Sequence, residues 1–279
     1  VPILCLSAVD DDSILTPRTC MILRSNPHPE EVRSLWYEKP MVAAEAEILN
    51  PAFDCTPRGF CHGLHHREGD SGATVYKGDV CMMLTERFPE FAPHLEEFVA
   101  VCHRLYEQGF VCAWDGNVSL RVGEHILVTP THLCKGDVRV EDLIVVDRAG
   151  RQLFGERRPS SELKVHLAVY AAKPEISAVV HAHPLYATAL YRAGRLPQTA
   201  LLMEAAESLG AVPLVPFIDH GTQALADAVG RAMPPEVRAC VLERHGTMTC
   251  GRSLEEAYFL TESLERLAKT ETILATVNF

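Results

Sequence analysis

The run Ala178–Pro184 constrains the fold of this chain more than any other segment. Its first three residues are small or β-branched and apolar, which is typical of a buried strand. His181 and His183 follow, and Pro184 ends the strand because proline has no N–H for the sheet ladder. Side chains alternate along a strand, so both imidazoles point to the same side. The sequence therefore predicts a β-sheet protein with two histidines at the rim of a strand.

Two distant residues extend this histidine pair into a candidate metal site. Glu162 begins a predicted helix, and His245 follows an apolar strand and precedes a glycine. Three imidazole nitrogens and one carboxylate oxygen form the ligand field of a borderline divalent metal, most often zinc. Mn²⁺, Co²⁺ and Fe²⁺ are alternatives. Each residue also has a structural interpretation, since an acid at a helix start favours the helix dipole and histidine is common at strand ends.

A second group of residues is suited to binding an anion. Gly116 and Asn117 lie in a predicted turn that could cradle a phosphate with its backbone. Ser160 and Ser161 stand at a helix start, where free N–H groups favour anions. Thr129 follows the next strand and could approach the same anion. The alternatives are an ordinary hairpin turn and a plain serine N-cap.

Periodicity predicts an α/β sandwich in which helices flank a mostly antiparallel central sheet. Strands are predicted both in hairpins and between helices. Helices are expected at residues 89–108, 161–172, 186–193, 222–233 and 253–276. Strands are expected at residues 118–122, 126–128, 143–146, 177–181, 239–242 and 247–250.

The chain divides near residue 82 in this interpretation. Residues 1–82 form a poorly structured N-terminal extension, and residues 83–279 form the catalytic domain. Within the extension, a helix is possible at Glu30–Leu49, and Pro51–Cys81 resembles a loop. Its scattered cysteines and histidines match no zinc-finger spacing, so a metal site there is a minor alternative. Another alternative is that the natural chain starts at one of the two methionines at the boundary.

Composition excludes several classes of function. The net charge of −11 argues against nonspecific nucleic-acid binding. No apolar run reaches the roughly 20 residues that a membrane span needs, and the N-terminus does not resemble a signal peptide. The ten cysteines are spread over the chain without a C-x-x-C pair, which predicts reduced thiols in the cytoplasm.

Residues 84–279 resemble the class II aldolase/adducin family. The resemblance is carried, in the family's order, by Asp115–Ser119, Thr129–Thr131, Lys135–Asp137 with Glu141–Leu143, Pro159–Glu162, Val180–Pro184 and Arg244–Gly246. It implies a three-layer α/β/α sandwich and a homotetramer with sites near subunit interfaces. It also implies a divalent metal held by Glu162, His181, His183 and His245. The substrate phosphate would be bound by Gly116, Asn117, Ser160 and Ser161, with Thr129 nearby.

The resemblance implies an aldolase that cleaves or forms a carbon–carbon bond in a small phosphorylated ketose through an enediolate. Glu162 would act as the general base. Epimerases of this family tend to carry aspartate at that position, so the glutamate favours an aldolase. The family's tyrosine proton donor aligns with Leu201, so the donor is open, with Glu204, Tyr186 and Tyr191 as candidates. The alternatives are a 4-epimerase, decarboxylase or dehydratase on the same site, an iron-dependent oxidase, and a non-catalytic adducin-like module.

Overall fold

The computed structural model describes residues 20–24, 52–56, 77–192 and 195–277. The chain divides into two units, Val1–Met83 and Leu84–Phe279. In the first unit, β1 (Cys20–Arg24) pairs antiparallel with β2 (Ala52–Thr56). The loop expected at Pro51–Cys81 is therefore wrong at β2 and at the start of α2 (Lys77–Arg87). A five-residue strand is too short for a clear period, and its partner lies far away in the sequence. The helix expected at residues 30–49 lies outside the described residues.

The second unit is built on one eight-stranded sheet with the order β6-β5-β4-β3-β7-β10-β9-β8. Every neighbouring pair is antiparallel except β8 and β9, which are parallel. This confirms the predicted mostly antiparallel central sheet. The strands are β3 (Asn117–Val122), β4 (His125–Val128), β5 (Ile144–Asp147), β6 (Gln152–Phe154), β7 (Ala178–Ala182), β8 (Leu214–Val215), β9 (Ala239–Leu242) and β10 (Gly246–Gly251).

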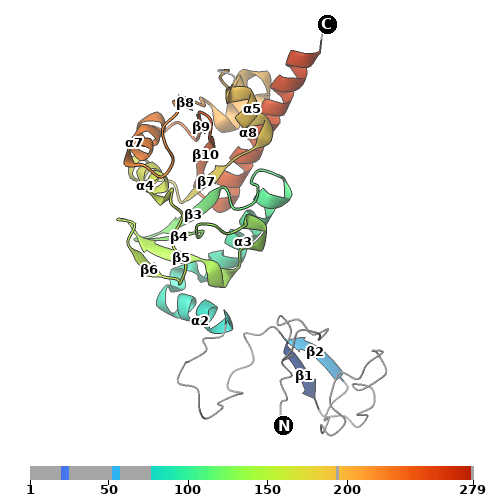
Figure 1. Ribbon diagram of the computed structural model, residues 1–279, viewed down its shortest axis with the longest axis vertical. Helices are drawn as coiled ribbons and strands as arrows, with labels where there is room; N and C mark the ends of the chain where they lie inside the picture. The colour runs from blue at the N-terminus through green and yellow to red at the C-terminus, as the bar shows by residue number, and fades with distance from the viewer. Residues whose placement is uncertain (1–19, 25–51, 57–76, 193–194, 278–279) are drawn as a thin grey trace. The chain divides into compact units, whose positions relative to one another are not determined.

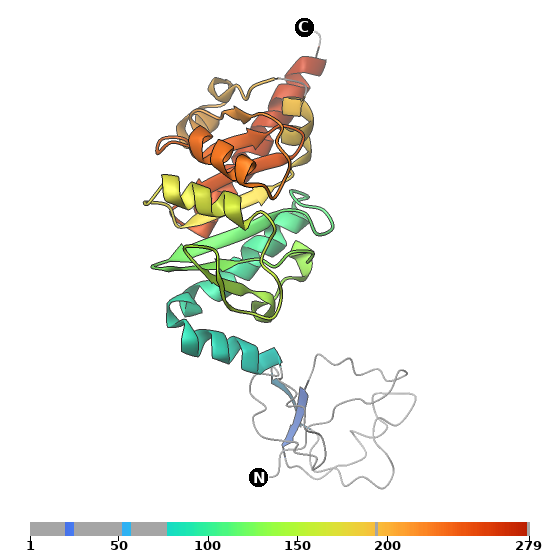
Figure 2. The same ribbon diagram turned by 60° about the vertical axis from the view of Figure 1, so that its left-hand side comes forward.

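Helices cover both faces of the sheet and give the three-layer arrangement (Figures 1 and 2). One face carries α4 (Leu163–Ala172) and α7 (Gln223–Ala232). The other carries α3 (Leu95–Glu107), α5 (Leu185–Arg192), α6 (Met203–Leu209) and α8 (Leu254–Thr276). Short 3₁₀ helices complete the unit: η2 (Pro89–His94), η3 (Lys135–Asp137), η4 (Val140–Asp142) and η5 (Thr199–Leu201). None of the helices in the described part of the chain has the length and apolarity that a bilayer span requires.

Side chains of β9 point alternately to the two faces of the sheet, so this strand packs against both helical layers. Cys240 and Leu242 pack into the cluster under α4 and α7, whereas Ala239 and Val241 pack into the cluster under α5, α6 and α8. On β7, Val179 belongs to the α4 side. The period of two therefore places His181 on the same side as Val179, which is the face where α4 begins.

Most predicted elements are confirmed, and the differences have local causes. The helix expected at residues 89–108 is divided into η2 and α3, because Pro93 cannot donate a helical hydrogen bond. Helix α3 buries Val101, whereas Val99 is only partly buried. Elements α6, β6 and β8 were missed because seven, three and two residues carry too little periodicity.

The pair Ser253 and Glu256 at the start of α8 has the spacing of a capping box, but the box forms only in part. Ser253 Oγ accepts a hydrogen bond from the Glu256 N–H at 3.1 Å, as an N-cap should. The Glu256 carboxylate, however, accepts from the N–H of Arg252 at 2.6 Å. The same two side chains thus accept hydrogen bonds from backbone N–H groups at the helix start. The Glu256 carboxylate, however, bonds the N–H of Arg252, one residue before the Ser253 N–H that a complete capping box would use.

Arg121 on β3 stabilises the C-terminal end of α4. Its guanidinium donates hydrogen bonds to the carbonyl oxygens of Tyr170, Lys173, Pro174 and Ile176, which the helix cannot satisfy itself. We expect Arg121→Ala to lower the free energy of unfolding by about 2 kcal/mol, the range for hydrogen bonds to a charged group. Urea unfolding measures this.

Arg148→Ala is the matched control for this prediction. Arg148 is mostly exposed and bonds only the carbonyl oxygen of Gly123 and the Glu124 carboxylate. Its loss should therefore change stability by less than about 0.5 kcal/mol. Equal effects of the two substitutions would contradict the capping role of Arg121.

Candidate metal centre

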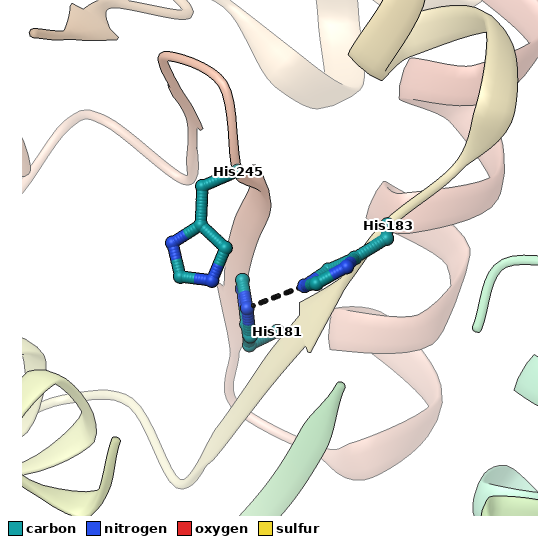
Figure 3. Close-up of side chains that lie close together, drawn as sticks. All are labelled: His181, His183 and His245. Carbon is teal, nitrogen blue, oxygen red and sulfur yellow. Dashed lines mark hydrogen bonds between the residues drawn. The ribbon is translucent and has the colours of Figure 1, made fainter. Parts of the chain in front are cut away.

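His181 on β7 and His183, directly after this strand, turn their Nε2 atoms toward each other (Figure 3). His181 is buried, and its Nδ1 donates a hydrogen bond to the carbonyl oxygen of Thr247 at 3.0 Å. His183 directs its Nδ1 to the Asp115 carboxylate, 3.3 Å away. With both Nδ1 atoms carrying protons, the two Nε2 atoms face each other at 2.9 Å. The partners of Nδ1 thus leave the Nε2 lone pairs as ligand atoms.

His245 joins this pair from the turn between β9 and β10. Its ring centroid lies 4.6 Å from that of His181 and 5.2 Å from that of His183. One nitrogen from each of the three rings lies within 4.8 Å of the others. The structure therefore brings together the three histidines that the sequence singled out (Figure 3).

Gly246 allows this close approach. A Cβ atom at this position would lie 2.4 Å from the Ala182 carbonyl oxygen and 2.6 Å from Cδ2 of His183. It would also lie 3.2 Å from Cε1 of His181. Only glycine lets β10 pass β7 at this distance while the histidine rings keep their positions.

Glu162 lies at the N-cap of α4 and completes the cluster. Its Oε2 lies 3.0 Å from His181 Nε2 and accepts a hydrogen bond from Asn117 Nδ2 at 3.1 Å. Its Oε1 lies 3.3 Å from His245 Nε2. This buried oxygen has no hydrogen-bond partner among the described residues. The structure thus places all four predicted metal ligands together.

Charges within the cluster perturb its pKa values. Burial alone would raise the pKa of Glu162, but the attraction of His181 and His245 and two hydrogen bonds lower it instead. Burial and the neighbouring imidazole of His181 lower the pKa of His245 to about 3. At neutral pH the cluster therefore holds an ionised carboxylate and a neutral His245, the forms in which both residues bind metals.

This donor set fits a divalent metal ion. Three imidazole nitrogens with a carboxylate oxygen are typical zinc ligands, and each Nδ1 of the β7 histidines is held by an acceptor. The unpartnered Glu162 Oε1 is a buried oxygen that a cation would satisfy. The residues present therefore suit the metal that the family implies.

The predicted phosphate-site residues lie in different environments. Gly116 has φ +68°, and a Cβ there would lie 2.4 Å from Val111 Cγ1. The amide of Asn117 is engaged with Glu162, and the buried hydroxyl of Thr129 bonds the backbone of Val118. The Ser160 hydroxyl accepts from the Glu162 N–H, whereas Ser161 is exposed. Of these hydroxyls, Ser161 is the most accessible, and phosphate binding stays a prediction.

Sequence reasoning missed Asp115 as a supporting residue. It lies in the predicted turn, and its partner His183 is 68 positions away, so no local pattern indicates the contact. Its other carboxylate oxygen accepts the Cys112 N–H at 2.6 Å, which fixes the side chain. Asp115 thus holds the Nδ1 proton of His183 and aims Nε2 at the centre.

We expect Asp115→Asn to weaken zinc binding by about 10- to 100-fold, the usual cost of losing a supporting carboxylate. The reason is that a neutral amide attracts the Nδ1 proton less and can turn its NH₂ group toward the ring. Competition with a chromogenic chelator measures the affinity. Asp147→Asn is the control, because Asp147 bonds only its own turn on β5. Unchanged zinc affinity in Asp115→Asn would contradict the supporting role.

Comparison with known proteins places this site in a family. Residues 96–272 match the class II aldolase and adducin N-terminal domain. The chain is 37% identical over 180 residues to the L-fuculose phosphate aldolase of Methanococcus vannielii, covering 64% of this chain and 96% of that protein. It is also 33% identical over 184 residues to the 3-oxo-tetronate 4-phosphate decarboxylase of Escherichia coli K12, covering 64% and 86%.

Solved structures agree with this assignment. YgbL of Escherichia coli, titled a putative aldolase, epimerase or decarboxylase, matches with a TM-score of 0.61 and 31% identity. The match covers 66% of this chain and 90% of that one. The L-fuculose-1-phosphate aldolase of Thermus thermophilus matches with a TM-score of 0.56 and 32% identity, covering 63% and 92%. The family match, the fold and the resemblance in the sequence agree, and the chain belongs to the class II aldolase and adducin N-terminal domain family.

Proposed function

We propose that this protein is a divalent-metal-dependent aldolase that cleaves or forms a carbon–carbon bond in a small phosphorylated ketose. The observation that carries the proposal is the convergence of three histidine nitrogens, two of which, from His181 and His245, lie against the carboxylate of Glu162. The fuculose-phosphate aldolases among the relatives support it. Zinc as the metal, a homotetramer and a cytoplasmic location belong to the same proposal.

In this proposal, His181, His183, His245 and Glu162 hold the metal. A bound divalent cation supplies Lewis acidity that stabilises negative charge developing on the substrate's oxygens. Glu162 is also the base, and it would leave the metal to take this role: its lowered pKa keeps it ionised, and Oε1 has no hydrogen bond to lose. It removes the proton from the carbon beside the substrate carbonyl and returns it in the reverse reaction.

The start of α4 supplies the phosphate site in this proposal. The positive end of the helix dipole and the hydroxyls of Ser160 and Ser161 favour an anion, and the same turn carries Glu162. A phosphate bound there would hold the reacting carbon near the base. Gly116, Asn117 and Thr129 border this region, and the side chains of Asn117 and Thr129 are engaged with protein groups.

A decarboxylase is the second candidate, because a relative at 33% identity is a 3-oxo-tetronate 4-phosphate decarboxylase. The same site would stabilise the carbanion left when carbon dioxide departs from such a substrate. An adducin-like module without catalysis is less well supported, since the chain has all four residues that would hold the metal, with the three histidines clustered and Glu162 against two of them.

Proton exchange tests the proposal. The zinc-loaded protein is incubated with dihydroxyacetone phosphate in deuterated water, and NMR follows the carbon-bound protons next to the carbonyl. Stereospecific loss of one proton signal, abolished by a chelator and restored by zinc, is the expected result. No exchange would sink the aldolase proposal, and release of carbon dioxide from 3-oxo-tetronate 4-phosphate would then favour the decarboxylase.

A further inference from the structure

A buried chain of hydrogen bonds runs between α4 and β3 and ends on Glu162. Tyr170 Oη lies 2.8 Å from Ser119 Oγ, which lies 2.7 Å from His166 Nδ1. His166 Nε2 is hydrogen-bonded to Asn117 Oδ1, and Asn117 Nδ2 donates to Glu162 Oε2 at 3.1 Å. All five side chains are buried. We call Tyr170, Ser119, His166 and Asn117 the buried relay.

The spacing of these residues explains how they meet. Glu162, His166 and Tyr170 are four residues apart on α4 and share one face of the helix. Asn117 and Ser119 are two residues apart on β3 and share one face of the sheet. The helical and strand periods therefore align five polar groups in the seam between the two elements.

The direction of each hydrogen bond in the relay follows from the Glu162 carboxylate at its end. An ionised carboxylate only accepts, so Asn117 must present its NH₂ group to Glu162 and its Oδ1 to His166. His166 must then donate from Nε2. Burial lowers the pKa of His166 to about 3, so the ring is neutral and Nδ1 accepts from Ser119. Each orientation thus depends on the next group along.

We propose that the buried relay is a positioning device, with His166 as its central residue, that holds Glu162 with Oε2 paired and Oε1 facing the histidines. The direction of the Asn117 amide is set at both ends: the Glu162 carboxylate requires the NH₂ group, and Nε2–H of His166 requires Oδ1. Without the His166 donor, Oδ1 would be buried without a partner, and the amide would be free to turn away from Glu162 toward another donor. The proposal rests on the proposed function, in which Glu162 is both ligand and base.

The polar character of the seam favours this role over plain structural support. The other buried side chains of α4 are apolar, namely those of Leu163, Val165 and Val169. Buried polar groups cost free energy unless every partner is in place, and apolar residues of similar volume would hold α4 on the sheet equally well. A role in orienting the Glu162 carboxylate explains why a fully paired polar relay is retained here and why it ends on this residue.

Two substitutions of His166 test the proposal. His166→Leu removes the donor to Asn117, whereas His166→Gln retains an N–H group that can reach it. We expect His166→Leu to weaken zinc binding about tenfold and to lower kcat about 10- to 100-fold with a smaller change in KM. His166→Gln should restore most of both. Zinc affinity is measured by chelator competition, and thermal unfolding reports on the fold.

Thr261→Val is the matched control. Thr261 is buried on the opposite face of the sheet, where its hydroxyl bonds Thr249 and the Ala257 carbonyl oxygen. Its loss should lower stability and leave zinc affinity unchanged. If a folded His166→Leu variant binds zinc like the wild type, or if His166→Gln is no better than His166→Leu, the relay does not position Glu162.

A measurement on the wild-type protein covers the case in which His166→Leu does not fold. Long-range ¹H–¹⁵N correlation of the histidine rings should show neutral His166 with its proton on Nε2. A proton on Nδ1 would overturn the proposal, since Nε2 would then have no hydrogen to donate to Asn117 Oδ1. The tautomer and the zinc affinities report on the relay, whereas proton exchange by the wild type reports on the proposed function, so the two failures are distinguishable.

Discussion

Replacing His183 by alanine is expected to weaken zinc binding by more than 100-fold, beyond the roughly 10- to 100-fold typical of supporting residues. The substitution removes one of three converging nitrogens and leaves the Asp115 carboxylate beside the site without its partner. Proton exchange with dihydroxyacetone phosphate should be lost at the same time. Chelator competition measures the first effect and NMR the second.

The control for this substitution is His94→Ala. His94 is half-exposed at the junction of η2 and α3, and its ionic partner Glu97 is 4.0 Å away. It should keep wild-type zinc affinity and exchange. A scaffold without catalysis would respond differently: His183→Ala would then change stability, while neither protein would exchange protons. Tight zinc binding by His183→Ala would show that the histidine cluster is not the metal site.

The second large effect is expected for Gly246→Ala. The new Cβ would overlap the Ala182 carbonyl oxygen and the His183 ring, at 2.4 and 2.6 Å. Relief requires β10 to move from β7 or His183 to leave its position, so the free energy of unfolding should fall by about 3 kcal/mol. Zinc affinity should fall with it, because the same atoms hold the ligand geometry. Urea unfolding and chelator competition measure the two effects.

Gly230→Ala is the control for this prediction. Gly230 lies inside α7, and a Cβ there would meet Ala168 Cβ at 3.5 Å, an ordinary contact. Alanine favours the helix, so stability should stay the same or rise by up to about 1 kcal/mol. If Gly246→Ala behaved like Gly230→Ala in both measurements, the close approach of β10 to the histidines would not limit the site.

The elements predicted correctly from the sequence share a local signal. Strands β3, β7, β9 and β10 are apolar or alternating, and α7 and α8 begin at Thr222 and Ser253, whose hydroxyls accept from N–H groups three residues on. The missed elements have no such signal. Strand β8 has two residues and forms only because β9 lies beside it. Its structure is a consequence of pairing across the chain.

The distinction between local sequence signals and contacts made across the chain also holds within the site. The sequence by itself indicated the residues of the candidate metal centre: the His-x-His spacing on a strand, Glu162 at a helix start, and His245 before a glycine. Only the tertiary structure decided how these groups are held. Asp115 meets His183, and His166 meets Asn117, across long stretches of sequence. It also placed the Thr129 hydroxyl against the backbone of Val118. The physical reason is that residue type and strand or helix period are local properties, whereas a hydrogen bond depends on the distance and direction between atoms that only folding brings together.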